Sequence, residues 1–170
     1  MSPVLRVTRS GTRYIADWGG GPRPCAIGPA GVGEKLREGD GVTPCGVWPL
    51  RRVLYRPDRL APPRTKLPLA AFTPDDGWCD APADPQYNRL VKLPYGASAE
   101  RMWRDDGLYD LLITIGFNDA PVRPGRGSAI FLHVAQPDYT ATQGCVALSR
   151  EDLLDAVAAL DADAVIDIHP

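Results

Sequence analysis

The sequence lacks any long hydrophobic run. None of its 170 residues lies in an apolar stretch long enough for a transmembrane helix, which needs roughly 20 such residues. The segment from Met1 to Trp18 also lacks the apolar core of a signal peptide. We therefore expect no membrane partner, and a cytoplasmic location if Met1 is the native start.

An excess of charge of one sign is also missing. The chain has 19 basic and 21 acidic residues, a formal net charge of −2, and neither a basic patch nor an acidic tail. Proteins that bind nucleic acid or anionic lipid usually carry a clustered positive charge. We therefore expect no nucleic-acid partner.

Metal-binding and phosphate-binding patterns are absent as well. The cysteines form no Cys-x-x-Cys pair, and the chain has only two histidines. The triplet Gly19-Gly20-Gly21 lacks the Gly-Lys-Ser/Thr ending of a phosphate-binding loop. We expect neither a metal nor a cofactor. The four cysteines are Cys25, Cys45, Cys79 and Cys145.

Glycine and proline are abundant, with 17 and 18 residues, which favours many turns and few long helices. The length suits a single domain, residues 1–170. Ser149 is a predicted N-cap of one helix, because an apolar stripe at helical spacing follows it. We expect a long loop over the sheet at 56–86 and a short helix or irregular turn at 98–106. Strands are predicted at 4–9, 13–17, 24–28, 47–55, 109–117, 128–132 and 164–168.

A histidine and a cysteine stand out in the stretch FLHVAQPDYTATQGCVALS. His133 ends an apolar run, and Thr142-Gln143-Gly144-Cys145 follows, leading into a second apolar run. A cysteine nucleophile needs a base, which His133 can be, and backbone N–H groups at Gly144 and Cys145 could hold an oxyanion. A buried structural cysteine and a structural histidine would give the same spacing.

The stretch resembles the motif of the L,D-transpeptidase catalytic domain, the YkuD family. That motif is a histidine, a gap of a dozen or so residues, then Ser/Thr-x-Gly-Cys and an aliphatic residue. Segments at 38–46, 77–91 and 109–133 are also similar to the family. The matching motif positions are His133, Thr142, Gly144, Cys145 and Val146.

The resemblance implies a mostly β fold, a sandwich or flattened barrel, with one helix in the C-terminal region. It implies that Cys145 attacks peptidoglycan stem peptides through a thioester, that the carbonyl of Val134 orients His133, and that a carbapenem forms a covalent adduct. It also points to a set of substrate-binding candidates. These are Thr142, Gln143, Asn118, Trp78, Asp80, Tyr87, Asn88, Ser128 and Arg64.

Two positions depart from many family members: Ala147 stands where they carry arginine, and Val134 where they carry glycine. Recognition of a substrate carboxylate must then come from elsewhere. The candidates for it are Asn118, Asn88, Arg64 and Arg123.

Three functions fit these observations. The first is a cytoplasmic L,D-carboxypeptidase that trims tetrapeptide muropeptides during cell-wall recycling. The second is an L,D-transpeptidase, periplasmic if the native start or the export route differs. The third is a non-catalytic domain that binds a wall peptide. The third is the weakest, because Cys145, His133 and Gly144 are all present. We expect the first over the second, because no targeting segment, wall-binding module or added element for a second stem peptide is evident and Ala147 departs from many cross-linking members.

Overall fold

The computed structural model describes residues 4–170, and nearly all of its regular structure is β. The principal sheet contains β1 (Val4–Ser10), β2 (Arg13–Asp17), β3 (Arg23–Cys25), β6 (Gly46–Tyr55), β7 (Leu69–Ala71), β11 (Leu111–Ile115), β12 (Phe131–Val134), β13 (Val146–Leu148) and β14 (Val165–Ile168). Two smaller sheets contain β8 (Asp76–Cys79), β9 (Leu90–Lys92) and β10 (Ala99–Arg101), and β4 (Val32–Gly33) and β5 (Thr43–Pro44). The helix is α1 (Arg150–Ala159).

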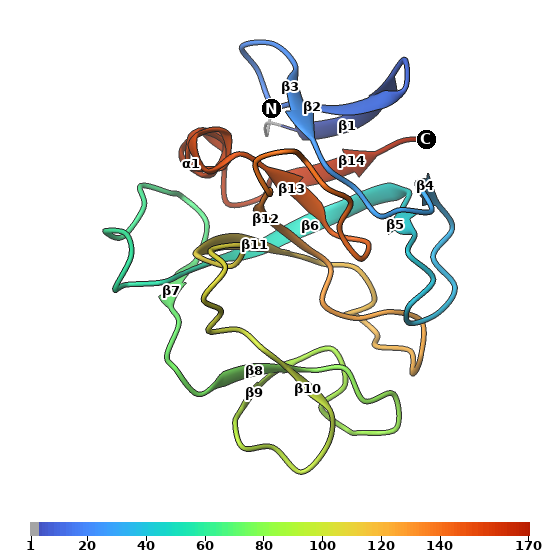
Figure 1. Cartoon of the computed structure of the whole chain (residues 1–170), viewed down its shortest axis with the longest axis vertical. Helices are drawn as coiled ribbons and strands as arrows, with labels where there is room; N and C mark the ends of the chain where they lie inside the picture. Colours follow the sequence, from blue (N-terminus) through green and yellow to red (C-terminus); the bar gives the residue numbers. More distant parts are fainter. Residues whose placement is uncertain (1–3) are drawn as a thin grey trace.

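The principal sheet curls into a nearly closed barrel. Its order is β13-β12-β11-β6-β14-β1-β2-β3, with β7 added beside β6. Ala26, just after β3, exchanges two backbone hydrogen bonds of 2.9 Å with Ala147 in β13, so the two ends of the sheet meet. Figure 1 shows the barrel strands gathered in the upper part of the molecule and the β8–β9–β10 sheet apart from them below. The predicted mostly β, flattened-barrel fold with one helix is confirmed.

The helix begins where the sequence predicts. The Ser149 side chain accepts a hydrogen bond from the Asp152 N–H (3.1 Å), and acidic residues in the first turn complement the helix dipole. Leu153, Ala156 and Val157 are its buried residues, and they belong to the same apolar cluster as the barrel interior. Burial of this stripe holds α1 on the barrel.

Two local predictions are wrong in part. The region 56–86 is not a continuous loop, because it contains β7 and β8. The region 98–106 contains no helix; a strand, β10, pairs there with β8, and residues 102–106 are irregular, as one of the two predicted conformations had it. These strands have three or four residues each, too few for an alternating pattern to be visible in the sequence. Their partners across the sheet decide their conformation.

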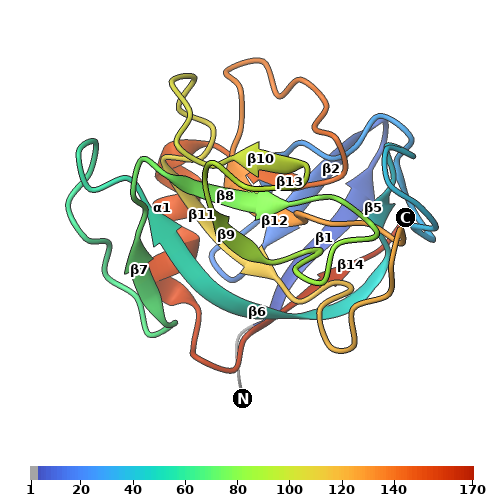
Figure 2. The same ribbon diagram turned by 90° about the horizontal axis from the view of Figure 1, so that it is seen from below.

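The apolar residues form two clusters, one on each face of the β11–β12 pair. Leu111 and Ile113 point into the barrel, whereas Leu112 points to the other side, toward the small sheet. In β12 the same alternation puts Leu132 inside the barrel and Phe131 outside. Figure 2 shows β8, β9 and β10 lying across this outer face. The candidate site lies in the second cluster, between barrel and small sheet.

Candidate active site

The strand register brings the predicted nucleophile and base onto one face of the sheet. β12 and β13 run parallel, with Leu132 opposite Val146 and His133 opposite Ala147. Cys145 lies two residues before Ala147, so it shares a face with His133. The loop between them supplies the length that a parallel connection requires. The sequence spacing therefore matters because it permits this particular pairing.

The Cys145 thiol is buried and held by two backbone groups. Its Sγ donates a hydrogen bond to the Ala129 carbonyl (3.2 Å) and accepts one from the Phe131 N–H (3.3 Å). Burial raises the pKa of the thiol to about 12. The resting nucleophile is a neutral thiol, so its reactivity depends on a base.

His133 is a buried, neutral imidazole with a defined tautomer. Its Nδ1 lies 2.9 Å from the Val134 carbonyl oxygen, which can only accept, so Nδ1 carries the hydrogen. Nε2 then has the free lone pair that a general base needs. Burial lowers the pKa of His133 to about 4, outweighing the opposite effect of the Val134 hydrogen bond. The contact predicted for the Val134 carbonyl is present.

The turn that carries Cys145 is braced by Thr142. The Thr142 hydroxyl donates to the Cys145 carbonyl (2.6 Å) and accepts from the Gly144 N–H (3.1 Å). Gly144 has φ +129°, and a Cβ there would lie 2.9 Å from the Val42 carbonyl oxygen, so only glycine fits. The Gly144 N–H is engaged inside the turn. Its predicted oxyanion role stays a prediction that requires this bond to open.

Cys145 and His133 both line a cleft of about 620 Å³ between the barrel and the small sheet. Its wall contains charged side chains from segments far apart in the sequence. Four of the predicted substrate-binding residues also line it. They are Thr142, Gln143, Ser128 and Asp80.

Asn88 lies behind the cleft wall and supports it. Its Oδ1 accepts hydrogen bonds from Trp78 Nε1 (2.9 Å) and from the Ala129 N–H (3.0 Å), and its Nδ2 donates to the Asn118 carbonyl (2.8 Å). The Ala129 carbonyl accepts the hydrogen bond that the Cys145 thiol donates. Asn88 therefore fixes the backbone that holds the nucleophile, a different position from the predicted contact with substrate.

Trp78 and Tyr87 are also packed behind the cleft. The Trp78 ring meets Phe131 edge to face, with ring centroids 4.9 Å apart. Tyr87 is buried, and its hydroxyl donates to Glu38 and accepts from the Gly127 N–H (3.1 Å). Neither ring lines the cleft, so both act on the site through the residues they hold.

The candidates for binding a substrate carboxylate do not reach the cleft. The Asn118 amide donates to the carbonyls of Arg123 (3.0 Å) and Gly127 (2.9 Å), and so braces its own loop. Arg123 lines a different hollow, and Arg64 is exposed between β6 and β7. The sequence showed which polar residues exist but not where their side chains point.

The cations that do line the cleft are Arg104 and Lys35, and neither was predicted. The Arg104 Nε and Nη2 atoms bind Asp106, and the guanidinium lies 4.8 Å from the centroid of the Tyr109 ring. Its Nη1 lies 3.6 Å from Glu100 and makes no hydrogen bond to a residue in the described range 4–170. Arg104 lies in the irregular segment after β10, where no sequence pattern predicts the direction of a side chain.

Three carboxylates share the cleft with these cations: Glu38, Asp80 and Glu100. Burial raises the pKa of Glu100, which accepts a hydrogen bond from the Tyr109 hydroxyl (2.5 Å). Asp80 Oδ1 is buried and has no hydrogen-bond partner among the described residues. The cleft can therefore accept hydrogen bonds from a ligand as well as bind an anionic group.

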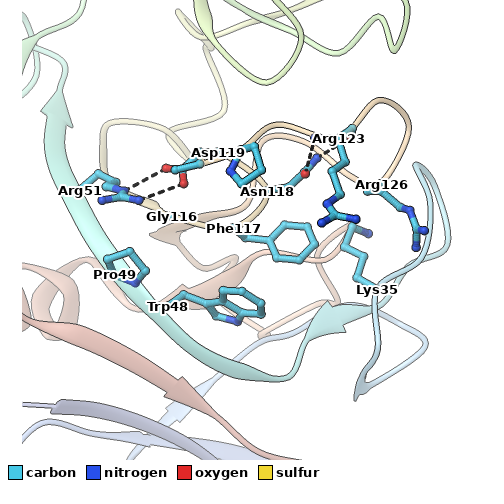
Figure 3. Close-up of a pocket in the computed structure, with 12 residues that line it drawn as sticks. Lys35, Trp48, Pro49, Arg51, Gly116, Phe117, Asn118, Asp119, Arg123 and Arg126 are labelled. Carbon is cyan, nitrogen blue, oxygen red and sulfur yellow. Dashed lines mark hydrogen bonds and ion pairs between the residues drawn. The ribbon is translucent and has the colours of Figure 1, made fainter.

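A second hollow, of about 420 Å³, lies between β6 and the 116–126 loop, and we refer to it as the basic hollow. Figure 3 shows Arg51 joined to Asp119 at one end and Arg123, Arg126 and Lys35 gathered at the other. Lys35 lines both this hollow and the cleft. The basic hollow contains neither the thiol nor the imidazole.

Among residues 4–170, no three His, Cys, Asp or Glu side chains gather in a way that could hold a metal ion. No helix in that range is long and apolar enough to cross a membrane.

Comparison with known proteins identifies this arrangement. The family model of the L,D-transpeptidase catalytic domain (YkuD) matches residues 5–168, nearly the whole chain. Searches of curated proteins and of solved structures found no match. Cysteine enzymes of this family act on peptidoglycan peptides. With the family match spanning both the barrel and the cleft, the chain belongs to the YkuD family of L,D-transpeptidase catalytic domains.

Proposed function

We propose that this protein is an L,D-carboxypeptidase that removes the terminal D-Ala from peptidoglycan tetrapeptides. The observation that carries the proposal is the pairing, on one sheet face and in one cleft, of the Cys145 thiol with an imidazole whose Nε2 is free to accept a proton. The reaction has two halves, and both use this pair.

In the first half, Nε2 of His133 takes the thiol proton while Sγ of Cys145 attacks the carbonyl carbon at the L-centre of diaminopimelate. The tetrahedral intermediate then expels D-Ala, whose amine takes the proton back from Nε2. A thioester to Cys145 remains. Tyr109 packs its ring 5.4 Å from the His133 ring, which keeps the imidazole in place through this transfer.

In the second half, His133 takes a proton from water, which attacks the thioester carbonyl. The C–S bond breaks, the tripeptide leaves as a carboxylic acid, and the Cys145 thiol regains its proton. The Cys145 N–H is our candidate donor to the oxyanion in both halves, because it belongs to the turn that Thr142 braces.

Arg104 is the residue we assign to a substrate carboxylate. Its Nη1 is the guanidinium nitrogen without a hydrogen bond to a described residue, and Asp106 fixes the rest of the group. A guanidinium held in this way can bind a carboxylate without first being ordered. Ala147 lies opposite His133 and is 1% exposed, and its backbone closes the barrel. An arginine side chain at this position would therefore require repacking of its neighbours.

Water as acceptor is supported by the form of the site. The thiol and the imidazole lie in one cleft, and the basic hollow does not extend to them. A transpeptidase must bind an amine acceptor well enough to outcompete water.

The alternative, an L,D-transpeptidase, is favoured by one feature of the same cleft. Asp80 Oδ1 has no partner among the described residues, and Glu38 and Glu100 line the same wall. These carboxylates could hold the ammonium of an incoming amine. A non-catalytic wall-peptide-binding domain is a weaker alternative, since the reactive pair is complete.

Product analysis separates the alternatives. Purified protein is incubated with a disaccharide tetrapeptide, with and without an added D-amino acid, and the products are identified by mass spectrometry. We expect tripeptide and free D-Ala in both cases. Dominant cross-linked dimers or exchange products would establish the transpeptidase, and binding without any product would establish the binding domain.

The cellular location is part of the same proposal. A carboxypeptidase of muropeptide recycling would act in the cytoplasm, where soluble muropeptides are the substrate. Fractionation of native cells tests this directly: recovery of the protein in the periplasm would move the proposal to the transpeptidase and its wall substrate.

A further inference from the structure

A lysine side chain is buried directly behind the catalytic turn. Lys35 belongs to the segment between β4 and β5, and its side chain is 3% exposed. Its stem passes Gly127, where a Cβ would lie 2.7 Å from Lys35 Cε. Its Nζ lies 3.5 Å from the place of a Cβ on Gly144. The glycine at 127 therefore leaves room for the stem of this lysine, and Nζ lies in contact range of the Gly144 turn. Figure 3 shows Lys35 from the side of the basic hollow.

Asp40 fixes the Lys35 ammonium in this position. The Lys35 Nζ donates to Asp40 Oδ1 (2.6 Å) and to the Val42 carbonyl (3.3 Å), and Asp40 also accepts from the N–H groups of Leu36 and Val42. Burial raises the pKa of Asp40, but the hydrogen bonds from Lys35 and these amides outweigh it and hold the pKa at about 2. The pair is ordered at both ends before any ligand binds.

We propose that Lys35 is a positioning residue that holds a fixed positive charge behind the Gly144–Cys145 turn and thereby favours the Cys145 thiolate. The inference rests on Cys145 as the nucleophile of the proposed function, but it concerns the thiol itself and not a substrate. Nothing in the family motif at 133–146 accounts for a buried lysine at this place.

Several charged groups face the thiol from the elements around it, and their effects differ in sign. Glu100, in β10, disfavours the thiolate, whereas Lys35 and Arg104 favour it. His133 is neutral at neutral pH, and Tyr109 is protonated because burial raises its pKa well above the usual value. Arg104 is about one-third exposed, so water screens its charge more than that of Lys35.

The test measures the thiol without a substrate. The rate of Cys145 alkylation by iodoacetamide is measured at one mildly alkaline pH, far below the pKa of the thiol, by peptide-resolved mass spectrometry, in the wild type and in Lys35→Met and Asp40→Asn. The rate there follows the thiolate fraction. We therefore expect it to fall about tenfold in Lys35→Met and to rise by less than tenfold in Asp40→Asn, since Lys35 acts on the thiol more strongly than Asp40. An Arg126→Gln control, from the basic hollow, should leave the rate unchanged.

The opposite signs separate charge from structure. If Lys35 only supported the turn, losing either member of the pair would disturb it in the same way, so rate changes in one direction overturn the proposal, as does no change. Should either single variant fail to fold, Lys35→Met/Asp40→Asn removes both charges together. Its alkylation rate should fall by less than tenfold, because the loss of Lys35 outweighs the loss of Asp40, and an unchanged rate overturns the proposal.

This result is independent of turnover. If the wild type cleaves no stem peptide but the two variants change the alkylation rate in opposite directions, the role of Lys35 stands and the proposed substrate falls. If tripeptide forms but the alkylation rates do not change, the proposed function stands and the role of Lys35 falls.

Discussion

The cleft and the basic hollow are two polar cavities, of about 620 and 420 Å³, that share one residue, Lys35. They differ in the solvent exposure of their ionisable groups. In the cleft, Cys145 and His133 are almost fully buried, and burial displaces both pKa values. In the basic hollow, Arg123 and Arg126 are exposed.

The difference teaches that burial, and not the number of charges, prepares a site for chemistry. In the basic hollow Arg51 and Asp119 satisfy each other through two hydrogen bonds of 2.9 and 3.0 Å near solvent, where such pairs contribute about 1 kcal/mol or less. In the cleft, Asp80 Oδ1 is buried without a hydrogen-bond partner among the described residues, and Arg104 Nη1 has the Glu100 carboxylate 3.6 Å away. A buried polar atom without a partner needs an explanation, and a bound ligand would supply one.

The largest expected effect is that of removing the nucleophile. Cys145→Ala should abolish turnover and the covalent carbapenem adduct, because the thiol supplies the bond-forming atom. Intact-mass analysis after incubation with a carbapenem and a peptide assay check both. The matched control is Cys45→Ala, which leaves the cleft intact and should retain both. Activity in Cys145→Ala would end the assignment.

The base should have the next largest effect. His133→Gln should lower kcat about a hundredfold or more, in line with general-base contributions, because no other neutral base lines the cleft among the described residues. Asp119→Asn, in the basic hollow, should leave kcat unchanged. A loss below tenfold in His133→Gln would show that another group activates the thiol.

Burial of His133 should also appear in the pH dependence of stability. Its pKa is about 4 when folded against an ordinary 6.5, so the unfolded chain binds the extra proton and acid destabilises the fold. The free energy of unfolding should lose about 3 kcal/mol from this group between pH 7 and pH 4.

Urea denaturation of the wild type and of His133→Gln across this range isolates the contribution of the imidazole. The free energy of unfolding of the wild type minus that of His133→Gln should fall as the pH falls below about 6.5. Parallel pH curves for the two proteins would mean that His133 is accessible to protons in the folded state.

The smallest effect, and the finest comparison of the two cavities, concerns arginine. Arg104→Gln should raise KM about tenfold with a smaller change in kcat, because it removes one charge-assisted contact to a substrate carboxylate. A substrate with a carboxamide in that place should show no such change. Arg123→Gln is the matched control and should leave KM unaltered; equal effects from both arginines would refute the assignment of Arg104.

Much of the fold followed from local chemistry. The strands at 4–9, 13–17, 47–55 and 164–168 were predicted within two residues, because each has a run of apolar or alternating side chains. Ser149 was a recognisable N-cap. β8 and β10 were missed, because strands this short depend on cross-strand partners that the sequence does not reveal.

The candidate pair could be predicted from the sequence, because His133 and Cys145, with a glycine before the cysteine, match the family motif. Only the tertiary structure decided which charges surround that pair. In the structure, Arg123 and Arg64 do not line the cleft, whereas Lys35 and Arg104 line it from segments in which we predicted no functional residue. The physical reason is that pKa values and ligand contacts depend on burial and distance, and both arise when strands remote in the chain close into one barrel.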